Sequence, residues 1–143
     1  MRHQNLLVVW LFLATTLVGC GATGPIFKPI AVPADKGVVY IYRESSFVGG
    51  GVYGTVSADK TPLTKIRNGG YFPFVANPGK VHFEVSTEAT NEADVVVEAG
   101  KEKYLKTTVG MGLLVGHLKF SEVSPDIGKA EIKECQLLEP IEP

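Results

Sequence analysis

The stretch YFPFVANPGKVHFEVS, residues 71–86, decides the fold of this chain. In its second half the apolar residues Val81, Phe83 and Val85 alternate with polar ones, which is the pattern of a strand that buries one face. Its first half is a second apolar run that ends at Asn77-Pro78-Gly79, a residue series typical of a turn. The stretch therefore predicts two short strands joined by a turn.

Similar patterns recur on both sides of this stretch. Turn residues separate short runs that are rich in valine, a residue favoured in strands. Asn68-Gly69-Gly70 and Ala99-Gly100-Lys101 are typical of turns that close hairpins. We therefore expect a mainly β fold, an antiparallel β-sandwich of about seven to eight strands. Besides the two strands above, the predicted strands are Val38–Tyr42, Val52–Ala58, Leu63–Arg67, Asp94–Glu98, Lys103–Val109 and Leu118–Val123.

The C-terminal part of the chain carries a helix signal. Ser124-Pro125-Asp126 is typical of a helix start, with serine at the N-cap and proline in the first turn. A short closing helix is expected over Ala130–Leu138. Gly128 counts against this helix, and a strand is the alternative.

The first residues are typical of a secretion signal. Of the 13 residues from Leu6 to Val18, 11 are apolar, and the cationic Arg2 precedes them. This run is shorter than the roughly 20 apolar residues that a membrane-spanning helix needs. A cationic start followed by a short apolar segment instead predicts a cleaved N-terminal signal helix.

The signal ends in Leu17-Val18-Gly19-Cys20, which resembles the lipobox of bacterial lipoproteins at every position. The resemblance implies cleavage after Gly19 and attachment of a diacylglyceryl group to the thiol of Cys20. Gly21 implies sorting to the outer membrane, facing the periplasm, if the cell is Gram-negative. The alternative is an ordinary secreted protein in which Cys20 carries no lipid.

Four segments follow from these features. We expect a signal peptide over residues 1–19, the lipidated cysteine and a proline-rich tether over 20–35, a β-sandwich domain over 36–138, and a tail over 139–143.

The proline-rich tether has two alternative conformations. Prolines recur at Pro25, Pro29 and Pro33, and an extended chain of about 3.1 Å per residue would hold the domain some tens of Å from the bilayer. Alternatively, the tether docks on the domain as an edge strand, where proline is tolerated. The apolar residues that would dock are Ile26, Phe27, Ile30 and Val32.

Charge and cysteine content exclude several classes of protein. The chain has 14 Lys+Arg and 15 Asp+Glu, a formal net charge of −1, so it lacks the basic footprint of a nucleic-acid-binding protein. Two cysteines are too few for a disulfide-rich domain or a cysteine-based zinc site. If Cys20 is lipidated, Cys135 has no partner, and we expect it to be buried and structural rather than reactive.

Six motifs occur in order along the chain: Val38-Val39-Tyr40-Ile41-Tyr42-Arg43, Phe47-Val48-Gly49-Gly50-Gly51, Asn68-Gly69-Gly70-Tyr71-Phe72, Asn77-Pro78-Gly79-Lys80-Val81-His82, Gly110-Met111-Gly112 and Glu131-Ile132-Lys133-Glu134-Cys135. Together they resemble bacterial lipoproteins that carry the domain of unknown function 2846. The resemblance extends over about Lys36 to Leu138. It implies a β-rich fold and a location in the cell envelope, and it implies no activity because that family is uncharacterised.

Two glycine-rich apolar loops are the candidate contact sites. Gly-x-Gly after a strand also suggests nucleotide binding, but that fingerprint needs a helix within a βαβ unit, so no cofactor is expected. The loops form either an apolar contact surface or, since exposed apolar patches are uncommon, the closed end of the core. The candidate residues are Phe47, Gly49, Gly50, Gly51, Gly110, Met111, Gly112, Leu113 and Leu114.

Histidines and aromatic residues are weaker candidates. His82 shares a strand face with Glu84, so it is either half of a metal or acid–base site or part of a solvated face. His117 lies beside the second glycine-rich loop. No Gly-x-Ser-x-Gly motif is present, and no catalytic residue and no metal site are expected. Five aromatic residues are expected in the sandwich core rather than on a stacking surface: Tyr40, Tyr42, Tyr53, Tyr71 and Phe72.

These observations predict a lipid-anchored protein of the bacterial cell envelope. Its non-enzymatic β-sandwich would bind another envelope component, foremost a protein, through the loops or an open sheet edge. Cys20 would supply the membrane contact, and no nucleic acid is expected. The alternative is a carrier of a small apolar ligand or lipid, with a cavity between the sheets that opens near Met111. A small hydrolase would need His82 or His117 within hydrogen-bond reach of a hydroxyl or thiol and a carboxylate.

Overall fold

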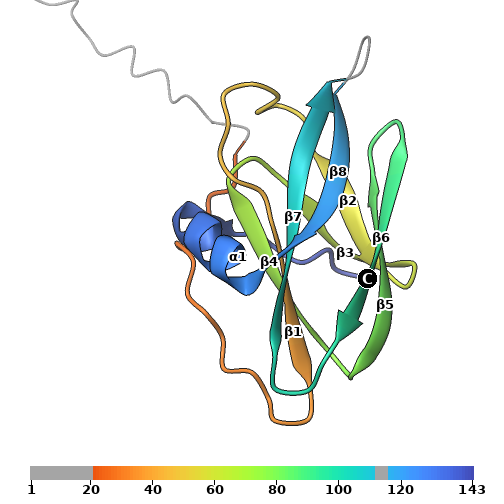
Figure 1. Ribbon diagram of the computed structural model, residues 1–143. Helices are drawn as coiled ribbons and strands as arrows, with labels where there is room; N and C mark the ends of the chain where they lie inside the picture. Colours follow the sequence, from red (N-terminus) through yellow and green to blue (C-terminus); the bar gives the residue numbers. More distant parts are fainter. Residues whose placement is uncertain (1–20, 112–115) are drawn as a thin grey trace, which may run out of the picture.

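The computed structural model describes residues 21–111 and 116–143, and in these residues two β-sheets pack face to face with a short helix outside them (Figure 1). The five-stranded sheet has the order β8-β7-β1-β4-β9, and the four-stranded sheet has the order β3-β2-β5-β6. No helix in the described part is long and apolar enough to span a membrane. The elements are β1 (Gly37–Tyr42), β2 (Gly54–Ala58), β3 (Thr61–Ile66), β4 (Gly70–Ala76), β5 (Gly79–Ser86), β6 (Thr90–Val97), β7 (Glu102–Met111), β8 (Gly116–Val123), α1 (Pro125–Glu131), the 3-10 helix η1 (Ile132–Glu134) and β9 (Gln136–Leu137).

The prediction of a mainly β sandwich is confirmed, but the sheets are not purely antiparallel. Strand β1 pairs in parallel with β7, and β4 pairs in parallel with β9. Both parallel pairs lie in the five-stranded sheet. Strand β7 follows β6 of the other sheet and is added beside β1, and the C-terminal strand β9 is added beside β4.

The two predicted hairpins at Asn68-Gly69-Gly70 and Ala99-Gly100-Lys101 are wrong. Each turn leads from a strand of the four-stranded sheet to a strand of the other sheet, β3 to β4 and β6 to β7. Gly69 and Gly100 do adopt positive φ, at 67° and 70°. Such a turn reverses the chain locally, but the burial of the next strand's apolar face decides which sheet that strand joins.

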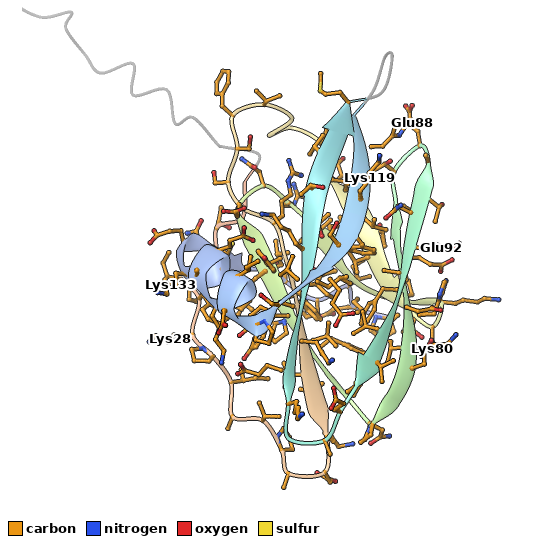
Figure 2. All side chains as sticks on the ribbon, viewed as in Figure 1. Lys28, Lys80, Glu88, Glu92, Lys119 and Lys133 are labelled. Atoms are coloured by element: carbon orange, nitrogen blue, oxygen red, sulfur yellow. The ribbon has the colours of Figure 1, made fainter. Side chains whose placement is uncertain are left out.

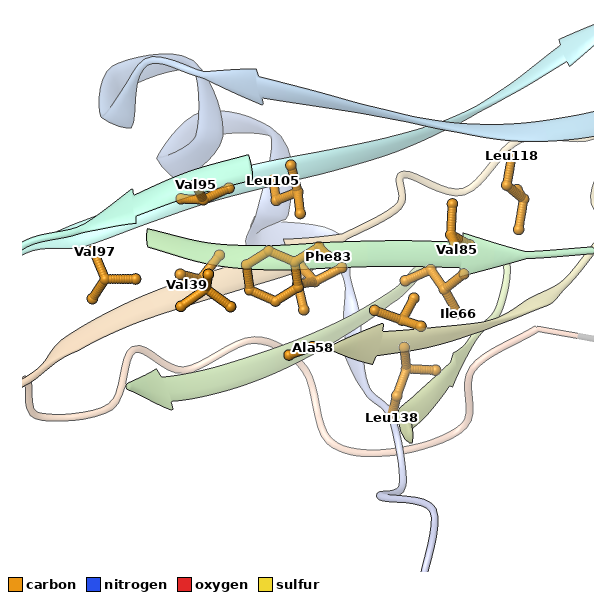
Figure 3. Close-up of a cluster of buried hydrophobic side chains, with 13 residues drawn as sticks. Val39, Ala58, Ile66, Phe83, Val85, Val95, Val97, Leu105, Leu118 and Leu138 are labelled. Carbon is orange, nitrogen blue, oxygen red and sulfur yellow. The ribbon is translucent and has the colours of Figure 1, made fainter. Parts of the chain in front are cut away.

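The main core lies between the two sheets and contains side chains of β5, the strand with the alternating apolar pattern. Val81, Phe83 and Val85 of β5 are buried, as their alternation predicts. The ring of Phe83 packs edge-to-face on Phe74 of β4, with the centroids 5.6 Å apart. Figure 3 shows Phe83 surrounded by Val39, Leu105, Ala58 and other buried side chains from both sheets. Each large side chain buried in this way stabilises the fold by about 1.5–3 kcal/mol.

A second core lies on the other face of the five-stranded sheet. All six residues of β1 are buried, because its outer face is covered as well as its inner one. This arrangement explains why Val38–Tyr42 reads as a continuous apolar run. The aromatic residues Tyr40, Tyr42 and Tyr71 lie in this outer core, beneath the C-terminal helical segment, and not between the sheets. Other members are Val38, Tyr104, Ile132 and Cys135, with Phe27, Val32, Val123 and Leu137 packed against them.

The predicted helix start is confirmed, with Ser124 at the N-cap and Pro125 in the first turn of α1. The predicted range Ala130–Leu138 is wrong, since α1 ends at Glu131 and the chain continues through η1 into β9. Gly128 lies inside α1 because a Cβ there would approach a ring carbon of Tyr104 to 2.2 Å. This glycine therefore permits close packing of α1 on the sheet, which outweighs its low helix propensity.

The proline-rich segment is docked on the domain. The amide of Phe27 donates to the carbonyl oxygen of Cys135 at 2.8 Å, and the amide of Leu137 donates to that of Pro25 at 2.8 Å. The Phe27 ring packs edge-to-face on Tyr40 and Tyr71. Of the four apolar residues expected to dock, Phe27 and Val32 pack on the outer core, whereas Ile26 and Ile30 are exposed. The segment forms one isolated bridge, from Ile26 to Gln136, and not the predicted edge strand.

Candidate contact surface

The first glycine-rich loop joins β1 to β2 and exposes its apolar side chains. Phe47 is 102% exposed and Val48 is 64% exposed. Met111, at the end of β7, is 83% exposed. In Figure 1 this loop and the adjoining ends of β7 and β8 lie at the same end of the sandwich, at the top of the view. We call Phe47, Val48 and Met111 the apolar end.

The glycines of the loop have different surroundings. Gly49 has a φ of 73°, and a Cβ there would lie 2.9 Å from a methyl group of Val109 in β7. Gly50 is similarly close to the carbonyl oxygen of Ser46, whereas Gly51 has open space around it. Gly49 therefore lets the loop pack closely against β7, while the neighbouring Phe47 points away from the core.

The two interpretations of the loops, a contact surface and the closed end of the core, therefore describe different residues. Val109 packs against the main core, as the core-closure alternative expects. Phe47 and Met111 are exposed, so that alternative does not describe them. Gly110 is paired with His117 of β8. The predicted residues Gly112, Leu113 and Leu114, like Gly19 and Cys20, lie outside the described residues.

Arg43 holds the loop in place. Its side chain is only 2% exposed, and its Nη2 donates a hydrogen bond of 2.6 Å to the carbonyl oxygen of Gly49. Its Nη1 donates to the carbonyl oxygen of Val52, so one guanidinium binds both arms of the loop. Burial lowers the pKa of Arg43 from its ordinary value. Arg43 was not among the residues predicted for the site. Its place in the sequence, as a lone cation between an apolar strand and a glycine run, could have indicated that it holds the loop.

Asn68 links the loop to the start of the described chain. Its Oδ1 accepts a hydrogen bond of 2.9 Å from the amide of Ser46. Its carbonyl oxygen accepts one of 3.0 Å from the amide of Ala22. The turn that was predicted to close a hairpin therefore fixes two distant segments beside each other.

Lys106, Glu44 and Glu131 form a charged network near the loop. Lys106 of β7 donates to Glu44 at 2.6 Å and to Glu131 of α1 at 2.8 Å. The hydroxyl of Tyr42, a fully buried side chain, donates to the other oxygen of Glu131. Burial and this contact with Glu131 raise the pKa of Tyr42. The network fastens α1 to the five-stranded sheet.

Two hollows adjoin the loop. One has a volume of about 310 Å³ and a mixed lining that includes Arg43, Glu44 and Lys106. The other has a volume of about 390 Å³ and is lined by Gly51, Val52, Tyr53, Thr87, Glu88 and Gly116. Between the sheets, where the carrier hypothesis expects a cavity, the space is occupied by fully buried side chains such as Phe83 and Ile41. No observation on the described residues favours an apolar ligand there.

His82 lies in a cluster that spans β5 and β6. Its Nδ1 is 2.7 Å from Asp94, and its Nε2 is 4.0 Å from Glu84 and 3.9 Å from Glu92. The hydrogen bond with Asp94 raises the pKa of His82. The Nε2 atom and oxygens of Glu84 and Glu92 lie within 4.8 Å of one another, close enough for a metal ion. The same groups form an ordinary exposed ion-pair cluster, and Figure 2 shows Glu92 and Lys80 on this outer side of the sandwich.

The groups that a hydrolase would need are not brought together in the described residues. The carboxylate beside His82 is present, but no hydrogen bond to a hydroxyl or thiol accompanies it. His117 has a buried Nδ1 without a hydrogen-bond partner among these residues. Cys135 is buried in the outer core, as expected, and burial raises the pKa of its thiol to about 12.

The fold defines a β-sandwich protein with a helix on one face, and its most distinct surface feature is the apolar end. A family model described as a protein of unknown function, DUF2846, matches residues 33–117. This match covers more than half of the chain, so the chain belongs to that family, as its motifs indicate. No curated protein and no solved structure matches the chain. The matched residues include the loop, Arg43 and Asn68, whereas α1 and β9 lie beyond them.

Proposed function

We propose that this chain is a lipid-anchored protein of the bacterial cell envelope, whose domain is a non-enzymatic module that binds another envelope component. The lipobox residues that end in Cys20 support the anchor, and Gly21 supports the outer membrane if the cell is Gram-negative. The bound component is either an envelope protein or a lipid surface.

One observation carries the proposal. The side chain of Phe47 is fully exposed on a loop whose two arms accept hydrogen bonds from the buried side chain of Arg43. Exposed apolar groups that cluster on a protein surface mark binding sites. A loop that is already ordered loses little conformational entropy when it binds, so its apolar contacts contribute more fully to affinity.

The proposal of a non-enzymatic role is supported by the surroundings of the two histidines. Neither is hydrogen-bonded to a hydroxyl or a thiol in the described residues, and the Cys135 thiol is buried and has a raised pKa. The apolar end itself contains no titratable side chain. Its chemistry suits contact and not proton transfer or nucleophilic attack.

Site-specific photo-crosslinking in intact cells tests this function. A benzophenone-bearing amino acid at position 47, in the full-length chain with its signal, should form a covalent adduct. The matched control places the same group at Val96, which is also exposed and apolar but lies on β6. Equal adduct formation at both positions, or none at position 47, contradicts the proposal.

A further inference from the structure

The start of the described chain lies beside the apolar end. The amide of Ala22 is bonded to the backbone of Asn68, and the side chain of Asn68 is bonded to Ser46, next to Phe47. Cys20 directly precedes Gly21 in the sequence, and consecutive Cα atoms are about 3.8 Å apart. If Cys20 carries lipid, no spacer separates the lipid from this end of the domain.

The residues around this position suit the interface of a bilayer. Phe47, Val48 and Met111 supply exposed apolar groups, and residues 47–52 contain no charge. Tyr53, a half-exposed aromatic residue, lies under the guanidinium of Arg67 at 5.0 Å. Aromatic residues with a polar tip are enriched at the boundary between lipid chains and head groups.

Two cationic side chains lie near residues 21–24, at the start of the described chain. Lys65 and Arg67 of the β3 region line a hollow together with residues 21–24. Neither side chain forms an ion pair within the part of the chain that the structure describes. Basic side chains beside a membrane anchor can meet lipid phosphates, as polybasic segments next to membranes do.

We propose that the apolar end rests on the bilayer that holds the Cys20 lipid, with Phe47, Val48 and Met111 inserted at the boundary between the lipid head groups and the acyl chains. This inference rests on the proposed anchoring and names the component that the loop binds. The position of residue 21 favours lipid over a protein partner, because the hydrogen bonds of Asn68 to Ala22 and Ser46 hold the loop close to the residue that follows the proposed lipid attachment. Arg43 keeps the loop directed outward, so insertion needs no rearrangement.

The absence of tryptophan from the mature chain gives a direct test. Trp10 lies in the signal and is the single tryptophan of the chain, so the variant Phe47→Trp carries one fluorescent reporter after cleavage. The lipoprotein is purified from cell membranes, its lipid is verified by mass, and it is placed in vesicles of phosphatidylcholine with brominated acyl chains. The control is Val96→Trp in the same anchored protein.

Bromine quenches tryptophan only on close approach, so the F47W emission should fall at least about twofold relative to unlabelled vesicles, while V96W should be unaffected. Met111→Trp is a second reporter at the same end, and it should be quenched like F47W. If the mass shows the lipid but F47W and M111W behave like V96W, the inference is overturned while the anchoring stands. If the mass shows no lipid on Cys20, the anchoring itself fails and the inference fails with it. In cells, a crosslink from position 47 to protein alone also overturns the inference and leaves the proposed function intact.

Discussion

The guanidinium of Arg43 lies 2.6 Å from the carbonyl oxygen of Gly49, six residues further along the chain. The same group binds Val52, and the loop between these contacts carries Phe47 at its surface. A buried cation that follows β1 therefore helps to determine the shape of the loop that exposes Phe47. The consequences of this contact and of four others can be measured.

Replacing Arg43 by alanine should destabilise the domain by about 1–3 kcal/mol, because two partly buried carbonyl oxygens lose a charged donor. Arg43→Lys should lose less, since it keeps the charge but not the two-pronged geometry. Urea unfolding measures both. Arg67→Ala is the control, because that guanidinium lies over the exposed ring of Tyr53 and should contribute less than about 1 kcal/mol. Equal stability of R43A and R67A would contradict the assigned role.

Gly128→Ala should destabilise the protein by about 1–3 kcal/mol, although alanine favours a helix, because the new Cβ overlaps the ring of Tyr104. Gly51→Ala should change stability by no more than about 1 kcal/mol, since nothing lies within 4 Å of its Cβ. Thermal or urea unfolding of the two variants gives the comparison. A stabilised G128A would show that α1 does not pack as described.

The thiol of Cys135 should react very slowly with a disulfide reagent at pH 8 in the folded protein. Burial raises its pKa to about 12, so almost no thiolate is present, and the sulfur is enclosed. In strong denaturant the reaction should become fast. If Cys20 is lipidated as proposed, the protein purified from membranes should then release one equivalent of reporter per chain, because only Cys135 keeps a free thiol. Fast reaction in the folded state would contradict the described burial.

Glu131 should make the stability depend on acid pH. Burial alone would raise its pKa, but hydrogen bonds from Lys106 and Tyr42 outweigh burial and lower the pKa. A lowered carboxyl pKa contributes stability above the unfolded-state value, and this stability is lost as the pH falls through the folded-state value. Urea midpoints should therefore fall from about pH 5 towards pH 3, and Glu131→Gln should make this dependence shallower. An unchanged slope in E131Q would contradict the network.

His82 should titrate above the ordinary histidine value, because Asp94 accepts its hydrogen bond. The folded state is thereby stabilised at low pH, and the contribution is lost as the pH rises through the raised pKa. An NMR titration of the ring protons measures this pKa, and Asp94→Asn should lower it. Glu88→Gln, in the exposed turn before β6, should leave it unchanged. A His82 pKa that is insensitive to D94N would contradict the pairing.

Part of the candidate site could be predicted from residue pattern. Phe47 and Met111 stand out as apolar residues in glycine-rich loops, and the structure finds both exposed. Arg43 carries a weaker signal, as a lone cation between an apolar strand and a glycine run, and Asn68 carries none. Asn68 bonds to Ser46, 22 positions earlier in the chain, and to Ala22, much further back, and such contacts arise only when the sheets bring distant segments together.

Local pattern was sufficient for the mainly β fold, for β5 and for the helix start at Ser124, because alternation, capping and turn chemistry depend on neighbouring residues. The assignment of β4 and β7 to the other sheet, the outer core beneath α1, and the docked segment before β1 were decided by tertiary structure. A turn residue permits a reversal of the chain whichever strand follows it. The partner of that strand is chosen by the free energy of burying apolar faces that lie far apart in sequence.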